Sequence, residues 1–144
     1  MPKSTSFANS LLELVLKATA FADFAENDST SPATNLYISL HTADPGIGGD
    51  QTTNEAAYTN YDRVAVARTG SGWTVVDEEA ANAALIQFPQ CGASGATVTH
   101  VAIGKADLPS AGLVIWAGAL AASLAVANLI QPQFSAGALT VAET

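Results

Sequence analysis

The feature that most constrains the fold is a succession of short apolar runs, separated by glycine, proline, asparagine and aspartate, that begins near residue 35. In the first run Leu36, Ile38 and Leu40 alternate with other residue types, and Ala-Asp-Pro-Gly at 43–46 then ends the alternation. A period of two residues is typical of a strand with one buried face. We expect strands at 35–42, 62–69, 72–76, 83–88, 97–104, 113–120, 122–129 and 137–142. With no helical pattern between these runs, the sequence predicts a mainly β fold, an antiparallel β-sandwich or barrel-like domain.

One α-helix is expected before this domain, at residues 5–22, where Phe7, Leu11 and Val15 recur at helical spacing. A hydroxyl group near residue 4 can cap its first turn. The polar segment 26–35 follows and has the composition of a tether. The expected organisation is therefore a helix and tether over 1–30 and a β-sandwich domain over 31–144. The helix could cover its own sheet or dock on a neighbouring subunit, and the sequence leaves both open.

The charge balance narrows the classes of partner. Five basic and 13 acidic residues give a net charge of −8, and the basic residues are scattered, so nucleic acid is not an expected partner. Only 12% of the residues are charged, which suggests either a small exposed surface or a surface that is partly covered by other subunits. The N-terminus lacks the pattern of a signal peptide, and synthesis in the cytoplasm is expected. The charge-free segment 113–130 could span a membrane as a helix, but Gly118, flanking prolines and the absence of flanking cations favour two buried strands and no membrane partner.

His41, Asp44 and His100 are the one set of residues that suggests a metal site, if their strands are neighbours. The spacing is weak, because an aspartate before Pro-Gly also arises as an ordinary turn. By alternation both histidines lie on the face opposite the main core. Neither a nucleophile elbow nor a phosphate-binding loop occurs, and Cys91 has no partner and is expected to be buried. We therefore expect no catalytic residue, metal or cofactor.

Contact surfaces are a more promising interpretation. The longest irregular stretch, 43–61, is a candidate contact loop, because long ordered loops are uncommon unless they are functional. Trp73, next to a glycine turn, is an interface candidate, whereas Trp116 is expected in the core and the acidic run 77–79 in a solvated turn. The candidate subunit or shell contacts are Phe7, Leu11, Val15, Asp44, Pro45, Ile47, Tyr58, Tyr61 and Trp73. The expected core residues are Leu36, Ile38, Leu40, Val64, Val66, Val101 and Ile103.

Several stretches resemble a family of small structural proteins of tailed-bacteriophage virions, encoded among the head and tail genes. They are LYISLHTADPG (36–46), NEAAYTNYDRVAV (54–66), VTHVAIG (98–104), IWAGAL (115–120) and FSAGALTV (134–141), in the same order. The resemblance covers nearly the whole chain after the N-terminal helix. It implies a short helix followed by a compact β-domain, and a virion protein without catalytic residues.

The place in the particle is a further expectation. A tail-fibre shaft normally carries sequence repeats, and none is visible here, so a capsid decoration (cement) protein on the outer head surface is favoured. Its expected partners are the major capsid protein and itself, as a homotrimer. The alternative is a tail, head–tail connector or tail-fibre-associated structural subunit. A more distant alternative is a small metal-dependent hydrolase that uses His41, Asp44 and His100.

Overall fold

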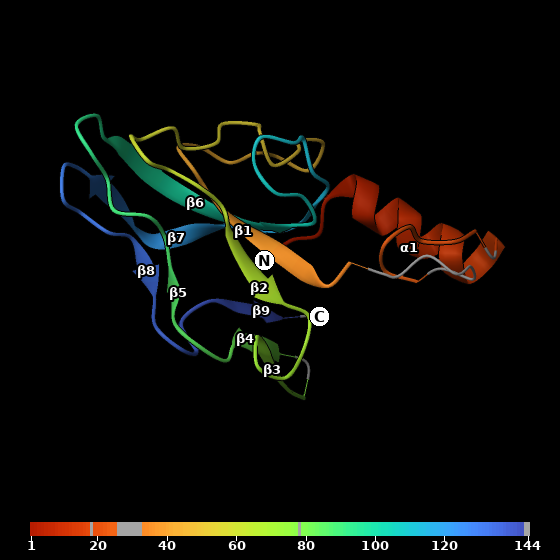
Figure 1. Cartoon of the computed structure of the whole chain (residues 1–144). Coiled ribbons are helices and arrows are strands. Elements are labelled where there is room, and N and C mark those ends of the chain that lie inside the picture. The colour runs from red at the N-terminus through yellow and green to blue at the C-terminus, as the bar shows by residue number, and fades with distance from the viewer. Residues whose placement is uncertain (18, 26–32, 78, 143–144) are drawn as a thin grey trace.

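The computed structural model describes residues 1–17, 19–25, 33–77 and 79–142 (Figure 1). One helix, α1 (Thr5–Lys17), precedes the strands. The strands are β1 (Asn35–His41), β2 (Val64–Ala67), β3 (Trp73–Val76), β4 (Glu79–Asn82), β5 (Ile86–Gln87), β6 (Ala96–Gly104), β7 (Val114–Val126), β8 (Gln133–Phe134) and β9 (Thr140–Ala142). The paired strands within the described ranges are all antiparallel. The predicted fold class, mainly β with one N-terminal helix, is confirmed.

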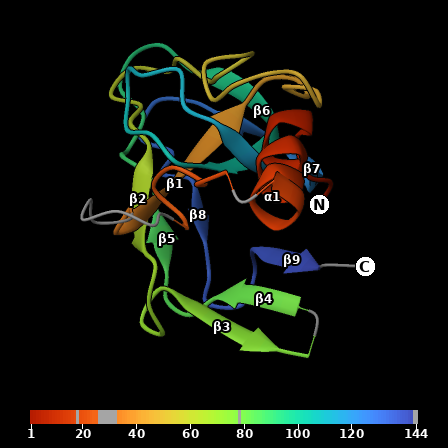
Figure 2. The same cartoon turned by 90° about the vertical axis from the view of Figure 1, so that its right-hand side faces the viewer.

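These strands form a four-stranded main sheet in the order β2-β1-β6-β7, a three-stranded small sheet in the order β3-β4-β9, and the pair β5-β8. The small sheet lies as a separate layer below the main sheet (Figure 2). In the centre of the main sheet Ile38 pairs with Ile103 and Leu40 with Val101. Six of the seven predicted core residues are buried, and the seventh, Val64, is half-buried against them. The alternation read from the sequence therefore identified the face of the main sheet that carries the core.

Several predicted strand boundaries are wrong. The segments 113–120 and 122–129 belong to one strand, β7, whose pairing with β6 shifts register between Val98 and His100. No glycine, proline, asparagine or aspartate lies between 119 and 125, so no turn interrupts the strand there. The segment 83–88 contains only β5, and β8 was not predicted because a strand of two residues has no detectable period.

The acidic turn and the start of the helix were predicted more accurately than the strand boundaries. Val76 pairs with Glu79, and Asp77 between them has a φ of 53°, a left-handed value that aspartate tolerates in tight turns. Glu78, the middle of the predicted acidic turn, lies outside the described residues. The helix begins where expected, because the Ser4 hydroxyl accepts a hydrogen bond from the Phe7 amide at 3.2 Å. It ends at Lys17, five residues before the predicted end at 22.

Within the described ranges, no helix is both long and apolar enough to cross a bilayer. The charge-free segment that raised this alternative is mostly strand β7.

Candidate interaction surfaces

The loop 43–61 is held against the main sheet on two sides. On one side the Ala56 amide donates to the Leu40 carbonyl at 2.8 Å, and His41 forms a bridge with Glu55. On the other side the Gln51 amide donates to the carbonyl of Gly112, in the connection between β6 and β7, at 2.9 Å. The loop is therefore a fixed part of the body, and its exposed residues are presented in defined positions.

A buried glutamine fills the space beneath this loop. The side chain of Gln51 is fully buried; its Nε2 donates to the Tyr37 carbonyl at 3.2 Å, and its Oε1 accepts from the Ala106 amide at 2.9 Å. Gly104 and Gly112 lie directly against the Gln51 side chain, and a Cβ on either glycine would lie 2.1 Å from it. Glycine is needed at both positions because a neighbouring polar group occupies the space.

A second buried polar cluster centres on Arg63, which is 5% exposed. Its Nε and Nη2 donate to the two carboxylate oxygens of Glu55 at 2.7 and 2.8 Å. Its Nη1 donates to the carbonyls of Ala106 and Ser110, each at 2.8 Å. Burial opposes the guanidinium charge, but the hydrogen bonds and charge of Glu55 outweigh it and raise the pKa of Arg63. The arginine thus ties loop 43–61 to the loop that follows β6.

Tyr61 belongs to the same cluster. Its hydroxyl donates to the Glu55 carboxylate at 2.9 Å and accepts from the Leu40 amide at 3.0 Å. Burial, and then the negative charge of Glu55, raise the pKa of the Tyr61 hydroxyl. The motif around Tyr61 and Arg63 in the quoted stretch 54–66 is therefore a structural clamp.

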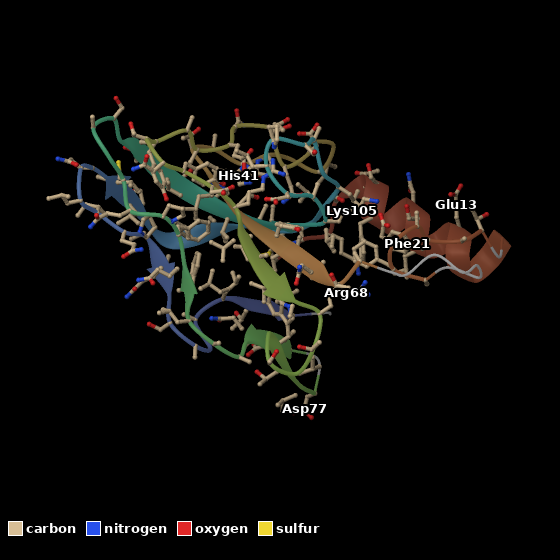
Figure 3. All side chains as sticks on the ribbon, viewed as in Figure 1. Glu13, Phe21, His41, Arg68, Asp77 and Lys105 are labelled. Carbon is tan, nitrogen blue, oxygen red and sulfur yellow. The ribbon has the colours of Figure 1, made fainter. Side chains whose placement is uncertain are left out.

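His41 is fully buried under this loop, and Figure 3 shows its position inside the body of the protein. Its Nδ1 lies 2.9 Å from the Thr53 carbonyl, which can only accept, so Nδ1 donates and Nε2 accepts from the Ser39 hydroxyl at 2.9 Å. Desolvation lowers the pKa of His41 and favours this neutral form. Both ring nitrogens are thereby engaged in structural hydrogen bonds.

The proposed metal set is consequently not assembled. His41 and His100 do lie opposite each other on β1 and β6, but Asp44 is exposed and its carboxylate caps the Gly46 amide at 2.8 Å. The residues that the structure describes contain no group of three potential ligands that could hold a metal ion. Both histidines were expected to lie on the face opposite the main core. Loop 43–61 covers that face, so that His41 is buried there.

The N-terminal residues lie along the free edge of β7. The Ser4 amide donates to the Ile115 carbonyl at 3.1 Å, and Lys3 forms an antiparallel bridge with Trp116. The ring of Phe7 packs against that of Trp116, with centroids 5.4 Å apart. In this structure the start of the chain therefore covers its own sheet.

The turn that follows α1 is pinned to the same end of the body. Lys105 forms an ion pair with Asp23, and Arg68 donates to the Asp23 carbonyl at 2.9 Å (Figure 3). The Arg68 guanidinium also lies over the ring of Phe24, 4.7 Å from its centroid. These contacts join residues 21–25 to β2 and to the end of β6.

The candidate contact residues fall into three groups. Leu11, Asp44 and Ile47 are exposed, and Ile47, at 66%, is more exposed than Leu11, at 39%. Phe7, Tyr61 and Trp73 are half-buried, and Pro45 and Tyr58 are buried, Tyr58 as part of the main core. Burial raises the pKa of Tyr58 to about 12, and its hydroxyl donates to the Pro89 carbonyl at 2.9 Å. The side chain of Val15 lies outside what the structure describes. The exposed residues remain predicted contacts.

A groove that the sequence did not reveal opens between the main sheet and the small sheet, with a volume of about 320 Å³. Its walls are apolar and come from segments far apart in the chain, including β1, β3, β6, β7 and β9. Trp73 and Trp116 both line it, so the interface candidate and the expected core tryptophan meet in one feature. No local pattern could have found it, because the β3–β4 hairpin on one side faces strands that lie far away in the sequence on the other.

The fixed loop, the closed polar clusters and the apolar groove together describe a β-rich structural protein whose distinctive surfaces suit contact with other proteins. The comparison with known families agrees. The family described as podophage GP4 fiber I protein gp80 matches residues 2–142, and the chain belongs to this family. It is a non-enzymatic structural component of a phage virion, a fibre protein. No curated protein matches the chain.

This family corrects the expected place in the particle. The resemblance to phage virion proteins is confirmed, but the match supports the fibre alternative and not the capsid decoration protein. The inference failed because the absence of repeats argues against a fibre shaft only. A fibre assembly also needs parts that are not shafts, and a compact β-domain can serve there.

Proposed function

We propose that this protein is a globular, non-shaft subunit of a fibre assembly and that it acts by binding other virion proteins. The family match over residues 2–142 carries the proposal. The shape is consistent with it, because the described strands form one body around one large core cluster and a small second one, without the repeated units of a shaft. Its work is then to hold other parts in place.

Loop 43–61 is the first proposed contact surface. Its exposed tip carries Ile47, a large apolar side chain that is 66% exposed, beside Asp44. The buried side chains of Gln51 and Arg63 hold this tip rigidly, so little conformational entropy is lost when a partner binds. Leu11 on α1 is a second exposed apolar residue of the same kind. We propose a homotrimer as the assembled form. Only 12% of the residues are charged, and a surface that is poor in charge is suited to burial against other subunits.

The test is to locate the protein in the particle. Heads and tails of purified virions are separated and analysed by mass spectrometry, with gold-labelled antibody on intact particles as an independent measurement. We expect the protein in the tail and fibre fraction. Recovery with heads alone, or absence from virions, would refute the proposal.

Light scattering on the purified protein addresses the oligomer. A trimeric mass is expected for the wild type and a smaller one for Ile47→Asp, because a carboxylate would be buried at the contact. Ala57→Asp, at another exposed position of the same loop, is the matched control. A monomeric mass at all concentrations would contradict the proposed homotrimer. It would not bear on the fibre location, which the separated particle fractions test independently.

A further inference from the structure

The apolar groove between the sheets continues the core to the surface. One wall is formed by Leu36, Ile103 and Trp116 of the main sheet, and the other by Trp73, Val75 and Val141 of the small sheet. Leu36, Ile103 and Val141 belong to the buried core, so the two layers are not fully packed against each other here. Its volume, about 320 Å³, lies within the range of about 300–1,000 Å³ that ligand clefts occupy. The space is suited to a large apolar side chain.

We propose that the groove binds an apolar side chain on an extended, basic segment of another virion protein. The inference rests on the proposed function, which supplies the virion partner. Insertion of such a side chain would complete the core between the two sheets, and most of the binding energy would come from apolar surface removed from water.

The charge of the partner follows from the acidic end of the groove. Asp77 and Glu79 line it and are exposed, and Figure 3 shows Asp77 at the far tip of the small sheet. Within the described ranges neither carboxylate has an ion-pair partner. Lysine or arginine residues that flank the inserted side chain would complement these charges.

A second copy of this chain is a poor occupant for the same reason. Each copy carries a net charge of −8. Arg63 is bound to Glu55, Lys105 to Asp23, and Arg68 to backbone carbonyls and the ring of Phe24. Three of the chain's five basic residues are therefore already engaged, and the like net charges of two copies would oppose the approach.

The backbone offers a way to hold an extended segment. β3 is an edge strand of the small sheet, and its residues Val75 and Val76 are 71% and 69% exposed. An uncovered edge with β-branched side chains is suited to pairing with another strand. Trp73 Nε1 is buried and has no acceptor in the described structure, so one groove-lining side chain carries an unsatisfied donor.

Tryptophan fluorescence provides a direct measurement, because both tryptophans of the chain line the groove. The probe is a tryptophan-free peptide, acetyl-Thr-Lys-Val-Phe-Val-Lys-Thr-amide, in which the phenylalanine and both lysines share one face of an extended chain. We expect a saturable change in emission. Replacing both lysines with glutamate, or the phenylalanine with serine, should weaken binding by about tenfold or more. No saturable change, or equal binding of the glutamate peptide, would overturn the proposal.

Variants locate the binding. Ala80→Leu fills the groove and should abolish the change. Asp77→Asn with Glu79→Gln should weaken binding by about tenfold and remove its salt dependence; asparagine tolerates the left-handed φ of 53° at position 77. Asp107→Asn, an exposed carboxylate in the loop that follows β6 and outside both the groove and loop 43–61, is the matched control and should bind normally.

The far-ultraviolet circular dichroism of each variant confirms that it folds. Peptide binding that survives Ala80→Leu would overturn the assigned site. Self-association of the protein that Ala80→Leu abolishes would identify a second copy as the occupant and also overturn the proposal. Neither result would move the protein out of the fibre fraction, so the proposed function is tested separately.

Discussion

The two sides of the main sheet are completed in different ways. On the side of loop 43–61, Gln51, Arg63 and His41 are buried with their polar atoms bonded to named partners. On the side of the small sheet, apolar residues face each other across a groove of about 320 Å³. Buried polar networks fix one geometry, whereas an underfilled apolar space can accept a partner. The comparison separates a region that buried polar groups hold rigid from one that we propose binds a partner.

The largest effect should come from breaking the buried ion pair. In Arg63→Met, Glu55 keeps a charge that is only 10% exposed and loses its partner. We expect the free energy of unfolding to fall by about 3–5 kcal/mol, measured by urea denaturation. Lys105→Met is the control, since the Lys105–Asp23 pair is 31% and 42% exposed and should contribute about 0–1 kcal/mol. Equal losses in both variants would show that the loop region is not held by this buried pair.

A smaller effect is expected from crowding Gln51. In Gly104→Ala the new Cβ would lie 2.1 Å from the glutamine side chain, which cannot move without losing its bonds to Tyr37 and Ala106. Urea denaturation should show a loss of about 1–3 kcal/mol. Gly48→Ala, where no atom lies within 4 Å of the new Cβ, should change stability by about 0.5 kcal/mol or less.

A double variant isolates the contact. Because Gln51→Ala removes the obstructing side chain, Gly104→Ala should cost less in that background than in the wild type. Additive losses would mean that the strain arises elsewhere than at Gln51.

Filling each region with the same substitution compares them directly. Ala80 lines the groove, so Ala80→Leu should raise the thermal midpoint and stabilise the protein by about 0.5–2 kcal/mol. Ala102 is fully buried in the main sheet, so Ala102→Leu should destabilise it by about 1–3 kcal/mol. If both variants lost stability equally, the groove would be packed as tightly as the core.

The sequence predicted what depends on local pattern. Alternation located β1 and its buried residues Ile38 and Leu40, and the cap at Ser4 located the start of α1. It missed the burial of His41, because alternation tells which face of the strand His41 lies on but not that loop 43–61 folds back over that face. It also missed the groove, since Trp73 and Trp116 meet only after the two sheets pack. Features made by distant segments have no period to detect.

The prediction of a place on the capsid was wrong for a different reason. The absence of repeats argues against the architecture of a repeated fibre shaft. It does not tell where in the particle a compact protein lies. Stretch 54–66, which carried much of the resemblance, contains the clamp of Glu55, Tyr61 and Arg63. This clamp explains how the stretch supports the fold, whereas the assignment to a fibre comes only with the family match.

The smallest expected effect is the response of the closed region to pH. Desolvation lowers the pKa of His41 in the folded protein below the usual 6.5, and the bond to Thr53 and the charge of Glu55 oppose this only in part. The unfolded chain therefore takes up the proton first as the pH falls. The stabilising contribution is complete above the unfolded pKa and is lost progressively below it.

We expect the free energy of unfolding to decrease as the pH falls from about 7.5 to about 5.5, with a slope from this residue of at most about 1.4 kcal/mol per pH unit. His41→Asn should remove that slope, since its amide can still donate to the Thr53 carbonyl but does not titrate in this range. The measurement is urea denaturation of both proteins across the range, and their difference isolates His41 from other titrating groups. Identical slopes would mean that the region beneath loop 43–61 admits a charged imidazole and is less closed than its hydrogen bonds indicate.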